Sequence, residues 1–235
     1  MKKFKLTSEF IVDISGVKLF RIKALIEFGN VKAGDLGGYI EKEENLSHMG
    51  NAWVSGNAQV SGDARVSGNA RVSGDARVFG NAQVSGDARV FGNARVSGDA
   101  RVSGNARVSG DARVFGNAQV SGDARVFGNA RVSGDARVSG NARVSGDARV
   151  FGNARVFGNA QVFGDARVSG DKDYAYAHGF GSCNRTTTFF RLKDGDVGVR
   201  CGCFYGTLAQ FRDNVCETHG ETKKAQEYLM LADLM

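Results

Sequence analysis

The sequence lacks the features that mark two common classes of protein. No stretch is long and apolar enough to span a membrane. Polar residues at positions 7–9 interrupt the apolar run that a secretory signal would need after its basic start, so we expect no export. The 4 cysteines all lie at or after Cys183, and this usage predicts the reducing environment of the cytoplasm. We therefore expect neither membrane insertion nor secretion.

Residues 51–170 consist of one repeated hexapeptide. The pattern Asn/Asp-Ala-Arg/Gln-Val-Ser/Phe-Gly occurs twenty times without insertion or deletion, with Trp53 in place of the first Arg. A fixed short period predicts a solenoid whose coils stack on near-copies of themselves. Val between two outward-facing neighbours is typical of a short strand with one buried side chain, and Gly followed by Asn or Asp is typical of a turn. Each hexad is therefore predicted to form one side and one corner of a coil.

The repeat also predicts the number of sides. Residues 75–110 recur letter for letter as residues 111–146, a unit of 36 residues that holds two coils of 18 but no whole number of 24-residue coils. Three hexads per coil would also place Asp over Asn at most corners, whereas an even number would stack like charges. Stacking at ~4.8 Å predicts a three-sided prism of about 6.7 coils, on the order of 30 Å long.

These hexads are similar to those of left-handed parallel β-helix proteins, the hexapeptide-repeat superfamily. Residues 30–54, with Leu-Gly-Gly-Tyr-Ile at 36–40 and Asn-Leu-Ser at 45–47, resemble the first segment of bacterial YdcK-like proteins, so the resemblance covers roughly residues 4–170. It implies a left-handed coil. Because such relatives are often described as acyltransferases, it also makes acyl transfer a candidate function. Residues 189–195, 201–208 and 217–220 resemble a C-terminal module of phage and prophage proteins.

The predicted fold is an all-β solenoid, a single-stranded left-handed parallel β-helix of triangular 18-residue coils, with two end pieces. Residues 1–50 are predicted to form an N-terminal β cap, with strands at 10–14 and 20–28 and a turn at Gly16. Residues 171–188 are predicted to be a linker. Residues 189–235 are predicted to form a ββαα module: a hairpin of 189–192 and 197–204, one helix from Thr207 to about His219, and another over 222–234.

Histidine is too scarce in the coils for the chemistry of known relatives. Acyltransferases that this fold resembles use a histidine as general base, and the resembling γ-type carbonic anhydrases hold their metal with three. The chain has only His48, His178 and His219, all outside the repeat. His48 directly precedes the first hexad, where a structural place in a turn or cap is favoured over catalysis. The sequence therefore favours a protein that is not an enzyme and needs no cofactor.

The C-terminal region has one set of residues with the composition of a metal site. Cys201, Cys203, Cys216 and His219 form a Cys-x-Cys…Cys-x-x-His pattern. Cys-x-Cys is tighter than the spacing usual in structural zinc sites, and free cysteine is commonly buried in ordinary cores. Core packing is thus favoured over metal binding, and redox chemistry is a third alternative.

Arginine is the strongest surface feature of the repeat. Its 15 Arg and 9 Asp account for the whole formal net charge of +6. Stacking at 18-residue intervals places five of them on one face (Arg71, Arg89, Arg107, Arg125, Arg143) and six on another (Arg77, Arg95, Arg113, Arg131, Arg149, Arg167). Such rows suit phosphates. However, the distance of ~4.8 Å between stacked arginines does not match the phosphate spacing of DNA, and no Tyr or Trp lies among them to stack on bases. A solvated face with Arg paired to Asp is favoured, with an anionic protein or nucleic acid as alternatives.

Seven outward phenylalanines also follow the 18-residue rule. They are predicted to stand on three faces, each separated from the next by Ser (Phe91, Phe127 and Phe163; Phe79, Phe115 and Phe151; Phe157). Exposed aromatic rows usually mark an interface. Self-association or docking of a partner is favoured over coverage by the C-terminal tail or isolated exposure. We therefore expect a non-catalytic binding scaffold for a protein partner or for its own copies, with acyl transfer and polyanion binding as the alternatives.

Overall fold

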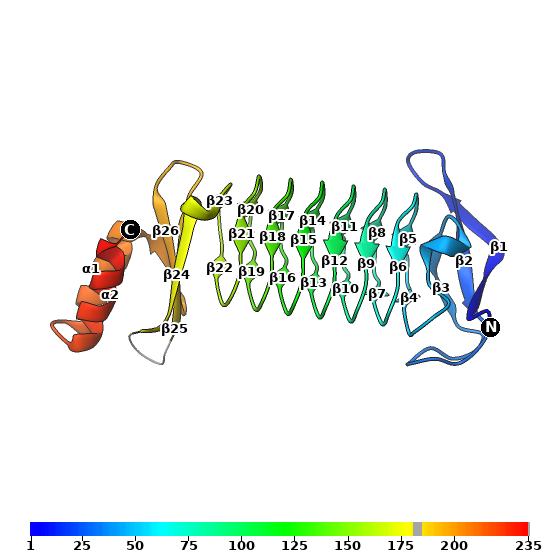
Figure 1. Cartoon of the computed structure of the whole chain (residues 1–235), viewed down its shortest axis with the longest axis horizontal. Helices are drawn as coiled ribbons and strands as arrows, with labels where there is room; N and C mark the ends of the chain where they lie inside the picture. Colours follow the sequence, from blue (N-terminus) through cyan, green and yellow to red (C-terminus); the bar gives the residue numbers. More distant parts are fainter. Residues whose placement is uncertain (181–184, 235) are drawn as a thin grey trace.

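The central half of the molecule is a three-sided parallel β-solenoid with one end piece at either end (Figure 1). The computed structural model describes residues 1–180 and 185–234. Each strand of the repeat pairs in parallel with the strand 18 residues further on, as Val60 does with Val78 and Val78 with Val96. The predicted coil of three hexads is therefore confirmed. The two termini lie at opposite ends of the solenoid.

Three faces result, and we call them the first, second and third face. The first face consists of β5 (Gln59–Val60), β8 (Arg77–Val78), β11 (Arg95–Val96), β14 (Arg113–Val114), β17 (Arg131–Val132), β20 (Arg149–Val150) and β23 (Arg167–Val168). The third face consists of β6 (Arg65–Val66), β9 (Gln83–Val84), β12 (Arg101–Val102), β15 (Gln119–Val120), β18 (Arg137–Val138) and β21 (Arg155–Val156). The second face consists of β4 (Trp53–Val54), β7 (Arg71–Val72), β10 (Arg89–Val90), β13 (Arg107–Val108), β16 (Arg125–Val126), β19 (Arg143–Val144) and β22 (Gln161–Val162).

The interior of the solenoid is made of valine and alanine alone. Every hexad Val from Val54 to Val168 is at most 1% exposed, and every hexad Ala from Ala52 to Ala166 is 0% exposed. Corners need glycine for two reasons. Gly116 has a φ of 70°, which L-residues with a side chain disfavour, and a Cβ there would lie 3.0 Å from the backbone nitrogen of Gly134 in the next coil. The repeated sequence thus satisfies one geometry twenty times.

Asparagine and aspartate form ladders along the corners. Asn117 Nδ2 donates to Asp135 Oδ1 one coil further on at 2.9 Å, and the same bond joins Asn81 to Asp99 at 2.9 Å. Others link Asn57, Asn69, Asn93, Asn105 and Asn129 to the Asp 18 residues later. The predicted stacking of Asn against Asp is confirmed, and it replaces like-charge contacts by hydrogen bonds.

The N-terminal cap extends the sheet of the first face. β1 (Phe4–Val12) and β2 (Lys18–Ala24) form an antiparallel hairpin, β2 pairs with β3 (Leu36–Ile40), and β3 pairs in parallel with β5. A short 3-10 helix, η1 (Glu43–Asn45), follows. The predicted turn at Gly16 is present, but β1 begins earlier than predicted and β2 ends at Ala24 rather than at residue 28.

The C-terminal module is larger than the predicted ββαα unit. A 3-10 helix, η2 (Asp171–Asp173), leads into an antiparallel sheet of β24 (Tyr174–Phe180), β25 (Arg185–Arg191), β26 (Val197–Cys201) and β27 (Phe204–Thr207). The prediction of a linker at 171–188 is therefore wrong for its described residues, because Tyr176 and Ala177 pair with Thr188 and Thr187.

Both predicted helices are confirmed. α1 (Leu208–His219) begins at Thr207, whose hydroxyl accepts from Gln210 N while Gln210 Oε1 accepts from Thr207 N, a capping box. α2 (Lys223–Asp233) begins at Thr222. The module closes the end of the solenoid, since Thr188 Oγ1 accepts from Gln161 N at 2.9 Å and Phe190 joins the valine core. Open strand edges at this end are thus covered.

Candidate functional site

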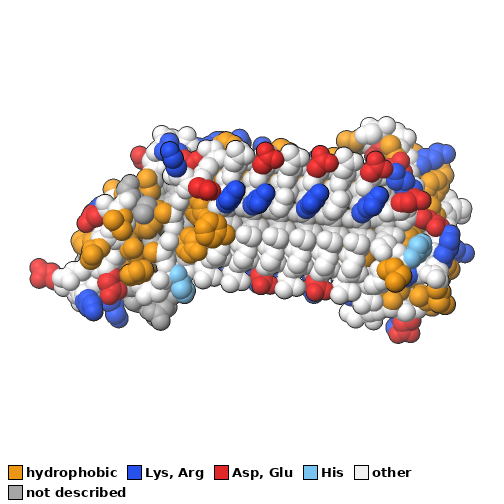
Figure 2. Space-filling model, viewed as in Figure 1, with side chains coloured by type: hydrophobic (Ala, Val, Ile, Leu, Met, Phe, Trp, Pro, Cys, Tyr) orange, Lys and Arg blue, Asp and Glu red, His pale blue; other side chains and the backbone are white. Residues whose placement is uncertain are grey.

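The Arg ladders stand on the faces where the 18-residue period places them. Arg95 pairs with Arg77 on one side and with Arg113 on the other, in register. The first face carries six consecutive Arg, and on the second face Arg71 to Arg143 make five. Gln83 and Gln119 interrupt the ladder of the third face. Figure 2 shows one side of the solenoid, with basic side chains in a row along it and apolar side chains gathered mainly over the two end pieces.

These guanidinium groups have no protein partner. Within residues 1–180 and 185–234, no side chain of a repeat Arg makes an ion pair within 4.0 Å or a hydrogen bond. The carboxylates at the corners are instead bound by Asn side chains, or by Lys42 at Asp63 and Lys193 at Asp165. The expected pairing of Arg with Asp is therefore wrong. With 15 Arg against 9 Asp in the repeat, the ladders present an excess of positive charge.

Six of the seven phenylalanines are exposed beside these ladders. Phe79, Phe91, Phe115, Phe127 and Phe151 are 36–40% exposed. The last two rows meet the C-terminal module: Phe157 lies edge-on to Tyr174 and Tyr176, and Phe163 is half-buried against Tyr205, with Arg200 over its ring at 5.1 Å. Phe157 nevertheless stays 50% exposed, so the predicted alternative of coverage by the tail holds for Phe163 alone.

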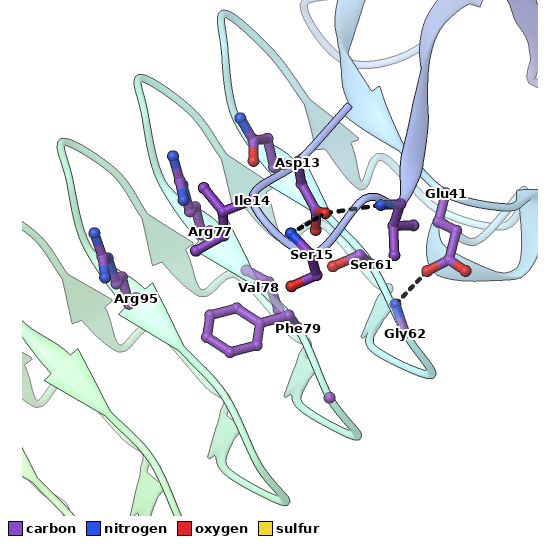
Figure 3. A pocket seen from close by; sticks show the side chains of 13 residues that line it. Asp13, Ile14, Ser15, Glu41, Ser61, Gly62, Arg77, Val78, Phe79 and Arg95 are labelled. Atoms are coloured by element: carbon purple, nitrogen blue, oxygen red, sulfur yellow. Dashed lines mark hydrogen bonds between the residues drawn. The ribbon is translucent and has the colours of Figure 1, made fainter. Parts of the chain in front are cut away.

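The first face has a cavity at its N-terminal end. The turn between β1 and β2 overhangs the coils that carry Arg77, Phe79 and Arg95, and encloses a volume of about 370 Å³ with them (Figure 3). Ile14, 91% exposed, points from this turn toward the solenoid. The carboxylates in the lining are already engaged, since Asp13 Oδ1 accepts from two backbone amides at 2.8 and 2.9 Å and Glu41 accepts from Gly62 N at 2.6 Å. The charged groups there without a hydrogen-bond partner are the guanidiniums of Arg77 and Arg95.

A second cavity lies farther along the same face. It has a volume of about 280 Å³ between the rings of Phe115 and Phe151, and the half-buried Ser133 lies between them. Arg131, Arg149 and Arg167 also line it. On the second face the equivalent serine between Phe127 and Phe163, Ser145, is only 4% exposed. All three phenylalanines of the first face are exposed, whereas on the second face Phe163 is half-buried.

The three histidines lie in the end pieces and not together. His48 packs in the N-terminal cap, with its ring 4.4 Å from that of Phe4 and its Nδ1 accepting from Lys3 N at 3.1 Å. Its Nε2 is buried, so a substrate cannot reach it. His178 Nδ1 lies 2.9 Å from Thr186 Oγ1, and His219 stacks on Tyr228. The cap position that the sequence favours for His48 is the one that the structure shows.

Lys3 is a buried charged residue of the same cap, which no sequence pattern predicted. Its side chain is almost fully buried, lies over the ring of Phe28, and donates to the carbonyl of Ala52 at 2.8 Å. Burial disfavours the charged form and lowers the pKa of Lys3 to about 8. The ammonium thus closes the end of the first coil, where carbonyl groups would otherwise be buried without a donor.

The cysteines of the C-terminal module are dispersed. Cys201 is buried and accepts from Thr187 Oγ1 at 3.2 Å, whereas Cys203 and Cys216 are exposed. Cys183 lies outside the described residues. In the part of the chain that the structure describes, no three His, Cys, Asp or Glu side chains are grouped so that they could hold a metal ion. Cys201, Cys203 and His219 instead border one cavity of about 370 Å³ beside α1.

Comparison with known families identifies the repeat. Overlapping segments that together run from residue 58 to residue 162 match the family model described as YdcK Beta solenoid repeat. The chain carries YdcK-type β-solenoid repeats. The match includes neither the N-terminal cap nor the C-terminal module, so the resemblance of those parts remains a prediction. No match was found among curated proteins. Among the described residues, no helix has the length and apolarity to cross a membrane.

Proposed function

We propose that the chain is a non-catalytic binding protein whose solenoid presents Arg and Phe rows to a protein partner. The observation that carries this proposal is the juxtaposition of unpaired guanidiniums with phenylalanines that stay 36–40% exposed. Exposed aromatic rows are uncommon on free surfaces, and Arg and Phe are both enriched at protein interfaces. A repeated face also permits many weak contacts to add.

The charge of the faces favours a different protein over a second copy. If the first faces of two copies met, the Arg ladder of one copy (Arg77 to Arg167) would face the identical ladder of the other. Like charges opposed in an interface weaken association. Self-association through other surfaces is the weaker form of the proposal. Nucleic acid is the second alternative, and the unpaired Arg ladders support it, but on the first and second faces a coil with serine lies between successive phenylalanines.

Acyl transfer is the alternative from another class of function. It is inherited from proteins with similar coils and needs a reachable general base. Each coil of the repeat lacks histidine, and the Nε2 atom of His48 is buried. Isothermal titration with acetyl-CoA separates the two classes. Saturable binding would favour the enzyme, and its absence would favour the binding protein.

The proposed setting is the cytoplasm of a bacterium, with the gene carried by a phage or prophage. This setting is supported by the resemblance of residues 189–195, 201–208 and 217–220 to modules of such proteins. The partner would then be a host protein, such as a component of host defence.

The binding function is tested with the immobilised chain and a bacterial lysate. The control is the variant in which Phe79, Phe115 and Phe151 are replaced by Ser, the residue that other hexads have at this position. A partner identified by mass spectrometry should be retained by the wild type and lost by the variant. Equal retention by both proteins would contradict the proposal.

A further inference from the structure

The first face has the chemistry of a docking groove with a defined ligand charge. Its six guanidiniums are unpaired, while the carboxylates of Asp13 and Glu41 beside them are engaged by backbone amides. The surface between the rings of Phe115 and Phe151 is hollowed to about 280 Å³. A ligand for this face must therefore bring negative charges on one side and apolar groups on the other.

The spacing of the phenylalanines indicates the secondary structure of that ligand. Phe79, Phe115 and Phe151 recur every second coil, about 9.6 Å apart along the axis. In an α-helix the seventh residue returns to the same face after about 10.5 Å. Side chains on one face of a strand recur after about 6.8 Å, and the phosphates of one DNA strand after about 3.4 Å. A helix inclined slightly to the solenoid axis matches this spacing, and a strand does not. Every third phosphate recurs after about 10.2 Å, so the spacing does not separate a helix from DNA, and the apolar rings beside the gaps favour the helix.

The ends of the face limit the length of the ligand. From Arg77 to Arg167 there are five steps between coils, which span about 24 Å, the length of about 16 helical residues. The overhanging turn with Ile14 stands at one end. At the other end Lys193, in the turn between β25 and β26, pairs with Asp165 at 2.9 Å. Both turns border the same face.

We propose that the first face binds an acidic amphipathic α-helix of a partner protein. Apolar side chains one heptad apart occupy the gaps between Phe79, Phe115 and Phe151, and Asp or Glu side chains lie over the Arg ladder from Arg77 to Arg167. This is the helix-in-groove mode of recognition. The inference rests on the proposed binding function and states the chemistry of its partner.

The test uses a labelled 18-residue peptide with Leu at heptad positions, Glu on the adjoining face, and Ala and Gln elsewhere. Fluorescence anisotropy measures its binding to the wild type, to Phe115→Ser/Phe151→Ser, and to Phe157→Ser as the control on the third face, which has no row of phenylalanines. The first variant should weaken binding at least about tenfold, as is usual for the loss of central aromatic contacts. The control should change it less than about twofold. Circular dichroism verifies that both variants fold.

A scrambled peptide of equal composition separates shape from charge. If it binds as tightly as the heptad peptide, or if the Phe115→Ser/Phe151→Ser variant binds unchanged, the helix is not recognised and the inference is overturned. A single-stranded oligonucleotide serves as a competitor for the heptad peptide. If it binds tightly and displaces the peptide at low salt but not at high salt, the face binds polyanions and the inference is likewise overturned. Phe-dependent retention of a lysate protein without binding of the heptad peptide would remove the helix while leaving the binding function intact.

Discussion

The unpaired Arg ladder predicts that removing arginine stabilises the protein. In the double variant Arg113→Gln/Arg131→Gln, three of the five neighbouring Arg pairs on the first face disappear. Glutamine occupies the same position in four other hexads, for example at Gln119, so the strands should be unaffected. At ~4.8 Å in water two unit charges repel by about 0.9 kcal/mol before screening. Three pairs give an upper limit of about 2.6 kcal/mol, because the long side chains can splay apart.

Salt makes this prediction specific. With a Debye length of about 30 Å at 0.01 M the repulsion is nearly complete, whereas at 1 M, where that length is about 3 Å, little remains. Thermal unfolding followed by circular dichroism should therefore give a higher Tm for the variant than for the wild type at 0.01 M salt, and nearly equal Tm values at 1 M. A variant that is less stable at both salt concentrations would show that these guanidiniums are paired in solution, which would refute the reasoning.

Three further predictions concern the corners and the N-terminal cap. Asn117→Asp would place three carboxylates next to one another in one corner stack, at positions 99, 117 and 135. It should lower the stability by about 1 kcal/mol at pH 7. Melts at different pH values should show this effect vanish below about pH 3, where the carboxylates are protonated. Gly116→Ala should cost at least about 1 kcal/mol in denaturant unfolding, because its φ of 70° and a Cβ at 3.0 Å from the next coil are both unfavourable; an unchanged midpoint would contradict this geometry. Lys3 has its pKa lowered to about 8 from 10.5, so the unfolded chain binds more protons between these values and stability should rise with pH there. Lys3→Met should remove this rise in Tm, and a rise equal to that of the wild type would show that another group causes it.

The solenoid could be predicted closely because one local rule is repeated. Val60 and its equivalents, the corner glycines and the duplicated 36 residues all specify the same coil, and the structure has it. The Asn–Asp ladders followed from the same period. Whether the arginines pair with the carboxylates could not be predicted, because the sequence does not show which donor each carboxylate accepts a hydrogen bond from. Asn117 reaches Asp135 across the coils, and Arg113 is left without a partner.

The end pieces were predicted less well, for a different physical reason. β3 contains Gly37 and Gly38, which weaken a strand by propensity. The structure needs them, since a Cβ on either would lie 2.6 Å from a backbone carbonyl of the first coils. β24 has an alternation of Tyr with Ala at Tyr174–Ala177 that was assigned to a linker. Whether Phe163 is covered depends on how that sheet packs against the solenoid, and no local sequence pattern predicts this packing.

The most direct test of the central claim, that the first face is where a partner binds, is site-specific photocrosslinking. A photoreactive phenylalanine analogue is placed at Ser133, in the cavity between Phe115 and Phe151, and for comparison at Ser139, on the third face, where the described phenylalanine is Phe157 at its end. Irradiation in a bacterial lysate, followed by mass spectrometry, should give adducts at position 133 with an acidic helical segment of one protein, and few at position 139. Equal adducts at both positions, or adducts at 139 alone, would contradict the account.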